Sequence, residues 1–149
     1  RIIVGEVRGK EAFDMLQAMN TGHEGSLTTL HANGPKDALN RLETMVLMSG
    51  LDIPIKAIRE YIASAIDLVV NIERMSDGKR KVTSISELER FHEGELELKE
   101  IFAFKQKGLT PNGEVDGEYI LYNETIPKVY KKIITKGITD IDFMFKDAK

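Results

Sequence analysis

Two short apolar runs of this chain are each followed closely by a side chain that can do chemistry. Residues 2–4 lead into Glu6, and residues 27–30 lead into His31. A carboxylate can orient a water molecule or hold one bound to Mg²⁺, and an imidazole can hydrogen-bond a phosphate oxygen. If the fold brings them together, Glu6 and His31 point to phosphate chemistry.

The elements around these residues predict how they are positioned. Residues 2–4 form a β-branched run typical of a buried strand, apolar residues at helical spacing over 12–19 predict an amphipathic helix, and 26–31 is rich in β-forming residues. Strand, helix and strand over about thirty residues make one βαβ unit with parallel strands. Ligands of open α/β sheets bind at the carboxyl ends of the strands, so we expect Glu6 and His31 side by side at that edge.

Start and stop signals place the remaining elements. Pro35 begins a second helix that Gly50 ends, and Pro54 opens a third. The further predictions are strands at 68–72, 82–91, 96–104 and 119–122, a hairpin at Asp77-Gly78, a turn at 111–113, and a last helix from Pro127 to Gly137. The fold class is therefore α/β, with half of an α/β core in residues 1–75 and a β-rich section with a terminal helix in 76–149.

Several apolar side chains have predicted places. Four methionines at helical spacing are expected in the core: Met15, Met19, Met45 and Met48. In the tail, Ile141, Phe143 and Phe145 alternate with polar residues, which suits either domain core or another role.

The composition excludes several classes of protein. The 149 residues include no cysteine, so a disulfide framework, a thiolate zinc site and a cysteine nucleophile are all ruled out. The net charge of −3 provides no broad basic field for nucleic acid. The longest uncharged apolar stretch, around 44–51, falls far short of the ~20 residues of a membrane span. Because the chain opens within an apolar run and without Met, we expect it to be part of a longer polypeptide.

Each candidate residue also has a plainer interpretation. Glu6 could be a surface or capping carboxylate after a strand, and His31 a hydrogen-bonded core histidine. His23 and Glu24 lie in a glycine-flanked loop, where a solvated pair is the simpler interpretation. A metal site of His23, Glu24 and His31 is disfavoured, because the spacing matches no helix-based ligand motif.

Taken together, the segments resemble a known family. Ile-Ile-Val-Gly-Glu-Val-Arg-Gly (2–9), followed by Thr-Gly-His-Glu-Gly-Ser-Leu-Thr-Thr-Leu-His-Ala-Asn (21–33), resembles the Walker B and His-box motifs of the type II and type IV secretion ATPase superfamily, whose members are hexameric RecA-like motors. Residues 14–23 and 37–45 look like the tight-adherence (Tad, Flp-type) pilus branch. The resemblance is dense over residues 1–90 and weaker to about residue 137. It implies a fold that is the C-terminal part of a RecA-like P-loop NTPase core.

The resemblance assigns roles residue by residue. Glu6 would be the Walker B glutamate that positions the attacking water and the Mg²⁺ shell, with Mg²⁺ held through water. His31 would be the His-box histidine near the γ-phosphate of ATP. Thr21 and His23 open the same box and would support the nucleotide site. Arg8 matches the motif arginine, and strand-edge ion pairing is its expected task.

One departure from the family pattern is large. The chain contains no Gly-x-x-x-x-Gly-Lys-[Ser/Thr] motif, so the phosphate cradle would lie upstream of Arg1. We therefore expect an ATPase parent and an inactive isolated chain. The truncation should also leave a sheet edge and apolar surface uncovered, which favours self-association.

The function expected from this resemblance is that of a cytoplasmic hexameric ATPase, peripheral to the inner membrane, that uses ATP and Mg²⁺. It would act on an inner-membrane platform protein of a pilus or secretion system, without nucleic acid. One alternative is a non-catalytic interaction module, either a degenerate paralogue or a domain that only contacts partners. Another is a DNA-processing RecA-like protein, which the acidic balance and the lack of a basic stripe with aromatics disfavour.

Overall fold

The structure is a computed structural model that describes residues 1–92, 95–122, 126–138 and 141. It divides into two compact units. Unit 1 consists of Arg1–Asp67 and Leu88–Leu98, and unit 2 of Leu68–Glu87 and the described residues from Lys99 onward. Phe143 and Phe145, for which the sequence left two interpretations open, lie outside the described residues.

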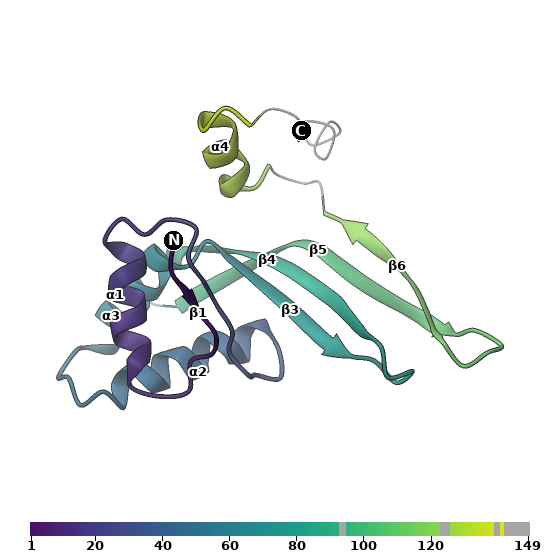
Figure 1. The fold of residues 1–149 in the computed structure, drawn as a ribbon, viewed down its shortest axis with the longest axis horizontal. Coiled ribbons are helices and arrows are strands. Elements are labelled where there is room, and N and C mark those ends of the chain that lie inside the picture. Colours follow the sequence, from purple (N-terminus) through teal and green to yellow (C-terminus); the bar gives the residue numbers. More distant parts are fainter. Residues whose placement is uncertain (93–94, 123–125, 139–140, 142–149) are drawn as a thin grey trace. The chain divides into compact units, whose positions relative to one another are not determined.

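Unit 1 begins with the expected strand–helix–strand order (Figure 1). Strands β1 (Ile3–Val4) and β2 (Leu27–Thr28) pair in parallel, and helix α1 (Glu11–Asn20) connects them. The second strand is shorter than the predicted 26–31. Beyond Thr28 the regular ladder gives way to a single backbone bond, in which the Val7 amide donates to the Thr29 carbonyl at 3.0 Å.

Two further helices complete unit 1, namely α2 (Pro35–Leu47) and α3 (Ile55–Ala65). Pro35 occupies the first turn of α2, where its missing N–H costs nothing. Gly50, with φ of +79°, allows the chain to turn away after the helix, as glycine does readily.

The core of unit 1 lies where the three helices pack against one another. Its largest fully buried side chains include Leu16 of α1 and Ile58 and Ile62 of α3. The other buried apolar residues of the helices are Ala12, Met15, Leu39, Leu42, Met45 and Val46. Burial of such side chains is the main favourable contribution to folding.

The prediction for the four methionines is only partly confirmed. Met15 and Met45 are buried and Met19 is half-buried, but the prediction for Met48 is wrong because its side chain is 69% exposed. Met48 caps the C-terminus of α2, beyond the turns whose apolar face packs on the other helices.

The parallel sheet of unit 1 has an uncovered apolar face. Ile3 and Leu27 are register partners and therefore share a face, and they are 76% and 63% exposed. The uncovered apolar surface predicted for this sheet is therefore present.

Unit 2 is built on an antiparallel sheet with strand order β3-β4-β5-β6 (Figure 1). The strands are β3 (Leu68–Arg74), β4 (Arg80–His92), β5 (Glu95–Leu109) and β6 (Val115–Leu121), and the ends of β4 and β5 at Leu88–Leu98 belong to unit 1. β6 begins earlier than predicted, because Val115 pairs with Leu109 directly after the turn. Helix α4 (Lys128–Thr135) follows, and its Val129 amide donates to the buried Glu87 carboxylate at 3.0 Å.

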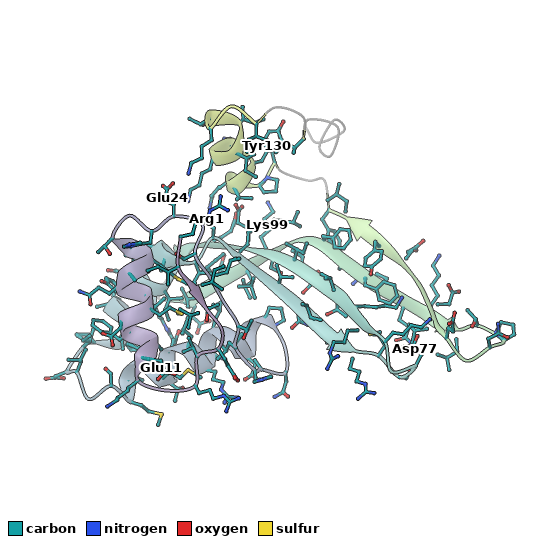
Figure 2. All side chains as sticks on the ribbon, viewed as in Figure 1. Arg1, Glu11, Glu24, Asp77, Lys99 and Tyr130 are labelled. Carbon is teal, nitrogen blue, oxygen red and sulfur yellow. The ribbon has the colours of Figure 1, made fainter. Side chains whose placement is uncertain are left out.

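Asp77, at the tip of the β3–β4 hairpin (Figure 2), connects the two turns of this sheet. Its Oδ1 accepts from the Lys79 amide and its Oδ2 from the Val115 amide, both at 2.9 Å. Lys79 adds an ion pair to Glu114 at 2.5 Å.

Among the described residues, no helix combines the length and the apolar character that a membrane span requires.

Candidate functional site

Glu6 and His31 lie in contact just beyond the carboxyl ends of β1 and β2. Glu6 Oε1 is 3.0 Å from His31 Nε2. The Glu6 side chain is 25% exposed, whereas that of His31 is 81% exposed. The imidazole is therefore open to solvent and to a ligand, and the simpler interpretation of His31 as a core histidine is wrong.

Arg8 holds the second oxygen of the same carboxylate. Its Nη2 is 2.6 Å from Glu6 Oε2, in the range of a charge-assisted hydrogen bond. This hydrogen bond is the largest cause that lowers the pKa of Glu6 below its ordinary 4.5. Desolvation, the next largest effect, raises the pKa, and the nearby charges of Arg8, His31 and Arg41 lower it. Glu6 is therefore ionised at neutral pH.

The other oxygen of the Glu6 carboxylate, Oε1, is not fully used as a hydrogen-bond acceptor. Oε1 is shielded from solvent and accepts no well-aligned hydrogen bond from the described residues, although His31 Nε2 lies close. The contact with His31 is thus mainly electrostatic, and Oε1 keeps the capacity to accept a further hydrogen bond. One carboxylate suits Mg²⁺, which usually binds through few carboxylates, water and substrate phosphates. No group of three or more His, Asp or Glu side chains that could hold a metal occurs among the residues the structure describes.

The segment that carries Glu6 and Arg8 is fixed from both sides. Val7 is 1% exposed and anchors it in unit 1. Glu11, at the start of α1 (Figure 2), accepts the Arg8 amide at 2.8 Å and the Gly9 amide at 3.1 Å through Oε1. These backbone hydrogen bonds, that from Arg8 above all, lower the pKa of Glu11. A carboxylate at a helix N-terminus is the typical acceptor for such amides.

The segment that carries His31 is tied to β1 and to α2. Thr29 Oγ1 donates to the Gly5 carbonyl at 2.6 Å, which connects the two strand ends. Arg41 Nη1 donates to the His31 carbonyl at 2.9 Å. Asp37 Oδ2 accepts the Asn33 amide at 2.9 Å and the Asn33 side chain at 3.2 Å.

Sequence analysis did not identify Arg41, Thr29 and Glu11 as part of this arrangement. Asp37 and Arg41 are four residues apart on one helix and therefore share a face of it. This spacing is the sequence signal that indicates that both could contact the same neighbouring segment.

The structure does not bring Thr21 and His23 to the Glu6–His31 pair. Thr21 Oγ1 donates to the Gln17 and Ala18 carbonyls, and His23 Nδ1 lies 3.1 Å from the Ala18 carbonyl. The His23 carbonyl accepts from Ser26 Oγ, which in turn accepts the Ile2 amide. Both side chains thus lie at the amino ends of β1 and β2, opposite to Glu6, because α1 returns the chain to the start of the sheet before β2.

Comparison with known proteins places the chain among secretion proteins. It is 41% identical over 88 residues to a putative conjugal transfer protein of Mycobacterium tuberculosis, which covers 59% of this chain and 24% of that protein. It is also 41% identical over 98 residues to a probable conjugal transfer protein TrbB of Sinorhizobium fredii, which covers 66% of this chain and 29% of that protein. The chain therefore spans about a quarter of the length of these relatives.

A solved structure of a secretion-system protein is also similar to this chain. The VirB11 ATPase from the Brucella suis type IV secretion system, in complex with sulphate, superposes with a TM-score of 0.53 at 34% identity, over 57% of this chain and 26% of that one. The family model described as type II/IV secretion system protein matches residues 1–134. This chain thus belongs to the type II/IV secretion system protein family, and its α/β fold is that of part of a RecA-like ATPase core.

Proposed function

We propose that this chain is the C-terminal portion of a hexameric ATPase that hydrolyses ATP to power pilus assembly or type II/IV protein secretion. The observation that carries the proposal is the contact between Glu6 and His31 at the carboxyl ends of neighbouring parallel strands, in a member of this family. Ligands of open α/β sheets bind at this edge.

Mg-ATP is the substrate that this arrangement suits. Phosphoryl transfer depends mainly on positioning and on neutralising charge. The ionised Glu6 orients the attacking water through Oε1, the oxygen without a well-aligned partner. His31 Nε2, exposed beside it, donates a hydrogen bond to a γ-phosphate oxygen, and the guanidinium of Arg8 offsets negative charge. Glu6 would hold Mg²⁺ through water, and the bound ion would supply positive charge that shields the phosphate oxygens.

The chain on its own lacks the parts that hold the phosphates. Its sequence contains no P-loop, so the backbone N–H cradle and the lysine that accompany Mg-ATP in P-loop proteins must come from a preceding segment. Isolated, the chain is expected to hydrolyse no ATP. The bound sulphate of the solved relative, a tetrahedral dianion like phosphate, is in keeping with an anion-binding family.

The family and two sequence segments support a proposal for the branch, the location and the partner of the full protein. Residues 14–23 and 37–45 support assignment to the Tad pilus branch. We expect the full protein to act in the cytoplasm at the inner membrane, on a platform protein of the pilus or secretion machine, without nucleic acid. Its negative net charge argues against a role on DNA.

The test compares Mg-ATP hydrolysis by this chain and by the same chain with its natural upstream region restored. Activity is expected only in the longer protein. There, Glu6→Gln removes the ionised oxygen that orients water, and His31→Ala removes the γ-phosphate donor, and we expect each to lower kcat by about a hundredfold or more. Glu60→Gln, which neutralises an exposed carboxylate on α3, is the matched control and should keep full activity.

Two outcomes would overturn the proposal. Hydrolysis by the isolated chain that disappears with Glu6→Gln would show that no upstream segment is needed. A longer protein that is folded and hexameric but inactive would mean that the Glu6–His31 contact is structural. The chain would then be a non-catalytic interaction module of a secretion or pilus machine.

A further inference from the structure

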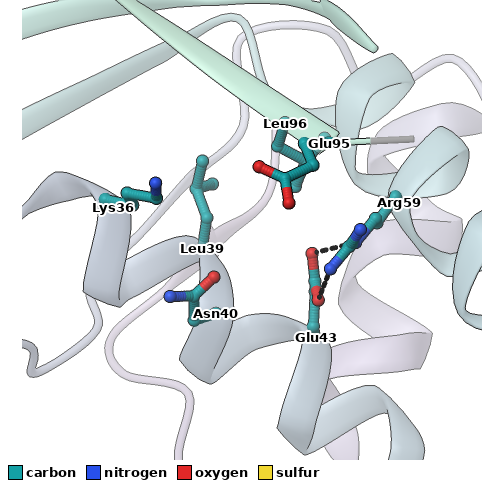
Figure 3. Close-up of a pocket in the computed structure, with 7 residues that line it drawn as sticks. All are labelled: Lys36, Leu39, Asn40, Glu43, Arg59, Glu95 and Leu96. Carbon is teal, nitrogen blue, oxygen red and sulfur yellow. Dashed lines mark hydrogen bonds and ion pairs between the residues drawn. The ribbon is translucent and has the colours of Figure 1, made fainter. Parts of the chain in front are cut away.

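Glu43 is a buried charge within the apolar face of α2. Its residue is only 8% exposed, and Leu42, Met45 and Val46 around it are buried too. A buried carboxylate is unfavourable unless it is paired and hydrogen-bonded. Arg59 of α3 satisfies it twice, with Nε 2.8 Å from Oε1 and Nη2 3.3 Å from Oε2. This bidentate pair, which we call the α2–α3 ion pair, lies beside a cavity of about 210 Å³ (Figure 3).

Helix α2 carries the His31 segment on another face. Arg41 donates to the His31 carbonyl, and Asp37 accepts the Asn33 amide. Positions 37 and 41 share a face of the helix, whereas position 43 lies about 200° further round the axis than 41, at roughly 100° per residue. One rigid helix therefore holds the His31 segment on one side and the α2–α3 ion pair on the other.

The apolar packing of α2 on the core is less directional than its ion pair with α3. The buried apolar side chains of α2 hold it against the core, but the hydrophobic effect is non-directional. A bidentate guanidinium–carboxylate pair has a fixed geometry and thus defines position as well as energy. The α2–α3 ion pair joins α2 to α3 through contacts that are directional on both partners.

We propose that Glu43 and Arg59 are positioning residues, whose ion pair fixes α2 and thereby keeps His31 against Glu6. The consequence for hydrolysis rests on the proposed function, whereas the effect on the His31–Glu6 contact does not. Neither residue touches the nucleotide in this scheme. They act through α2, Arg41 and the His31 carbonyl.

The same cavity offers a matched control. Glu95 lines it, is exposed, and points its carboxylate toward the α2–α3 ion pair (Figure 3). The hydrogen bond to Glu43 is the largest cause that raises the pKa of Arg59, and the Glu95 charge adds a smaller contribution. Glu95→Gln therefore removes an equal charge from the same cavity without breaking the α2–α3 ion pair.

The test follows the imidazole ¹⁵N and ¹H resonances of His31 by NMR in this chain. Glu6→Gln defines the shift that accompanies loss of the contact. We expect Glu43→Gln, and the double variant Glu43→Leu with Arg59→Leu, to move the His31 resonances in the same direction, and Glu95→Gln to leave them in place. Replacing both partners of a buried ion pair by apolar residues is often neutral for stability, so the double variant separates position from folding.

Thermal melts of the same variants complete the test. If the double variant is folded and its His31 resonances are unchanged, the α2–α3 ion pair has no positioning role and the proposal is wrong. If Glu43→Gln unfolds the chain, the double variant alone decides. In the longer protein, we expect the double variant to lower kcat by about ten- to a hundredfold, with little change in KM for ATP. An inactive wild-type protein would contradict the proposed function but not the NMR result.

Discussion

Ile62 offers a direct test of the three-helix core that carries the site. It lies on α3 and is 0% exposed, whereas Ile55, on the same helix, is 41% exposed. Ile62→Ala removes side-chain carbons whose burial is worth about 2.5 kcal/mol at roughly 0.8 kcal/mol each. The cavity left behind adds to this, so we expect a total cost of about 3 to 4 kcal/mol.

The assay is urea unfolding followed by far-UV circular dichroism. For a slope of about 2 kcal/mol per molar urea, Ile62→Ala should lower the midpoint by about 1.5 to 2 M without changing the slope. Ile55→Ala loses less burial and gains some helix propensity, so its cost should stay below about 1 kcal/mol. Equal costs for the two variants would show that α3 does not bury Ile62 as the structure has it, and the position of α2 and His31 would then be in doubt.

Three further predictions concern the sheets. Gly117→Ala should destabilise the chain by about 1 to 3 kcal/mol, because the new Cβ would lie 2.5 Å from the main chain of β5. Gly108→Ala is the control, because its new Cβ would have no atom within 4 Å. Thermal melts of the two variants should show a lower Tm for Gly117→Ala alone. Asp77 has a pKa lowered below 3.8, chiefly by backbone hydrogen bonds, so its contribution to stability is present above pH 3.8 and is lost as the pH falls through the lower folded-state value. The difference in Tm between the wild type and Asp77→Asn should therefore shrink on acidification, and a difference independent of pH would contradict this. Thr29→Val should speed amide hydrogen exchange where β1 and β2 end, because it removes the 2.6 Å hydrogen bond from Thr29 Oγ1 to the Gly5 carbonyl. Thr28→Val loses only the 3.4 Å contact of Thr28 Oγ1 with the Thr29 carbonyl and should leave the exchange rates unchanged.

Local signals in the sequence predicted much of the fold. The βαβ order, the start of α2 at Pro35 and its end near Gly50 follow from periodicity, proline and glycine chemistry, and the structure contains all of them. The juxtaposition of Glu6 and His31 was also predictable, because the carboxyl ends of neighbouring parallel strands must meet at one edge.

The sequence could not predict which polar side chains would be buried or used for positioning. Glu43 interrupts an apolar face and looks like a surface carboxylate until α3 places Arg59, 16 residues away, opposite it. Arg41 and Thr29 act on carbonyl groups, and no side-chain pattern reveals which carbonyl a donor will find. Such contacts depend on tertiary distances, which periodicity does not encode.

The charges around Glu6 answer two demands that would otherwise conflict. In the proposed function Glu6 must be ionised to orient water, yet an anion beside a polyphosphate is unfavourable. Burial in an apolar pocket would hold the side chain in place but raise its pKa and neutralise it. The hydrogen bond from Arg8, together with the charges of Arg8, His31 and Arg41, instead lowers the pKa of Glu6, so the group stays ionised while the two guanidinium groups favour phosphate. A site of this kind must remain polar and partly open, which explains why hydrogen bonds and ion pairs add to the buried Val7 in fixing its position.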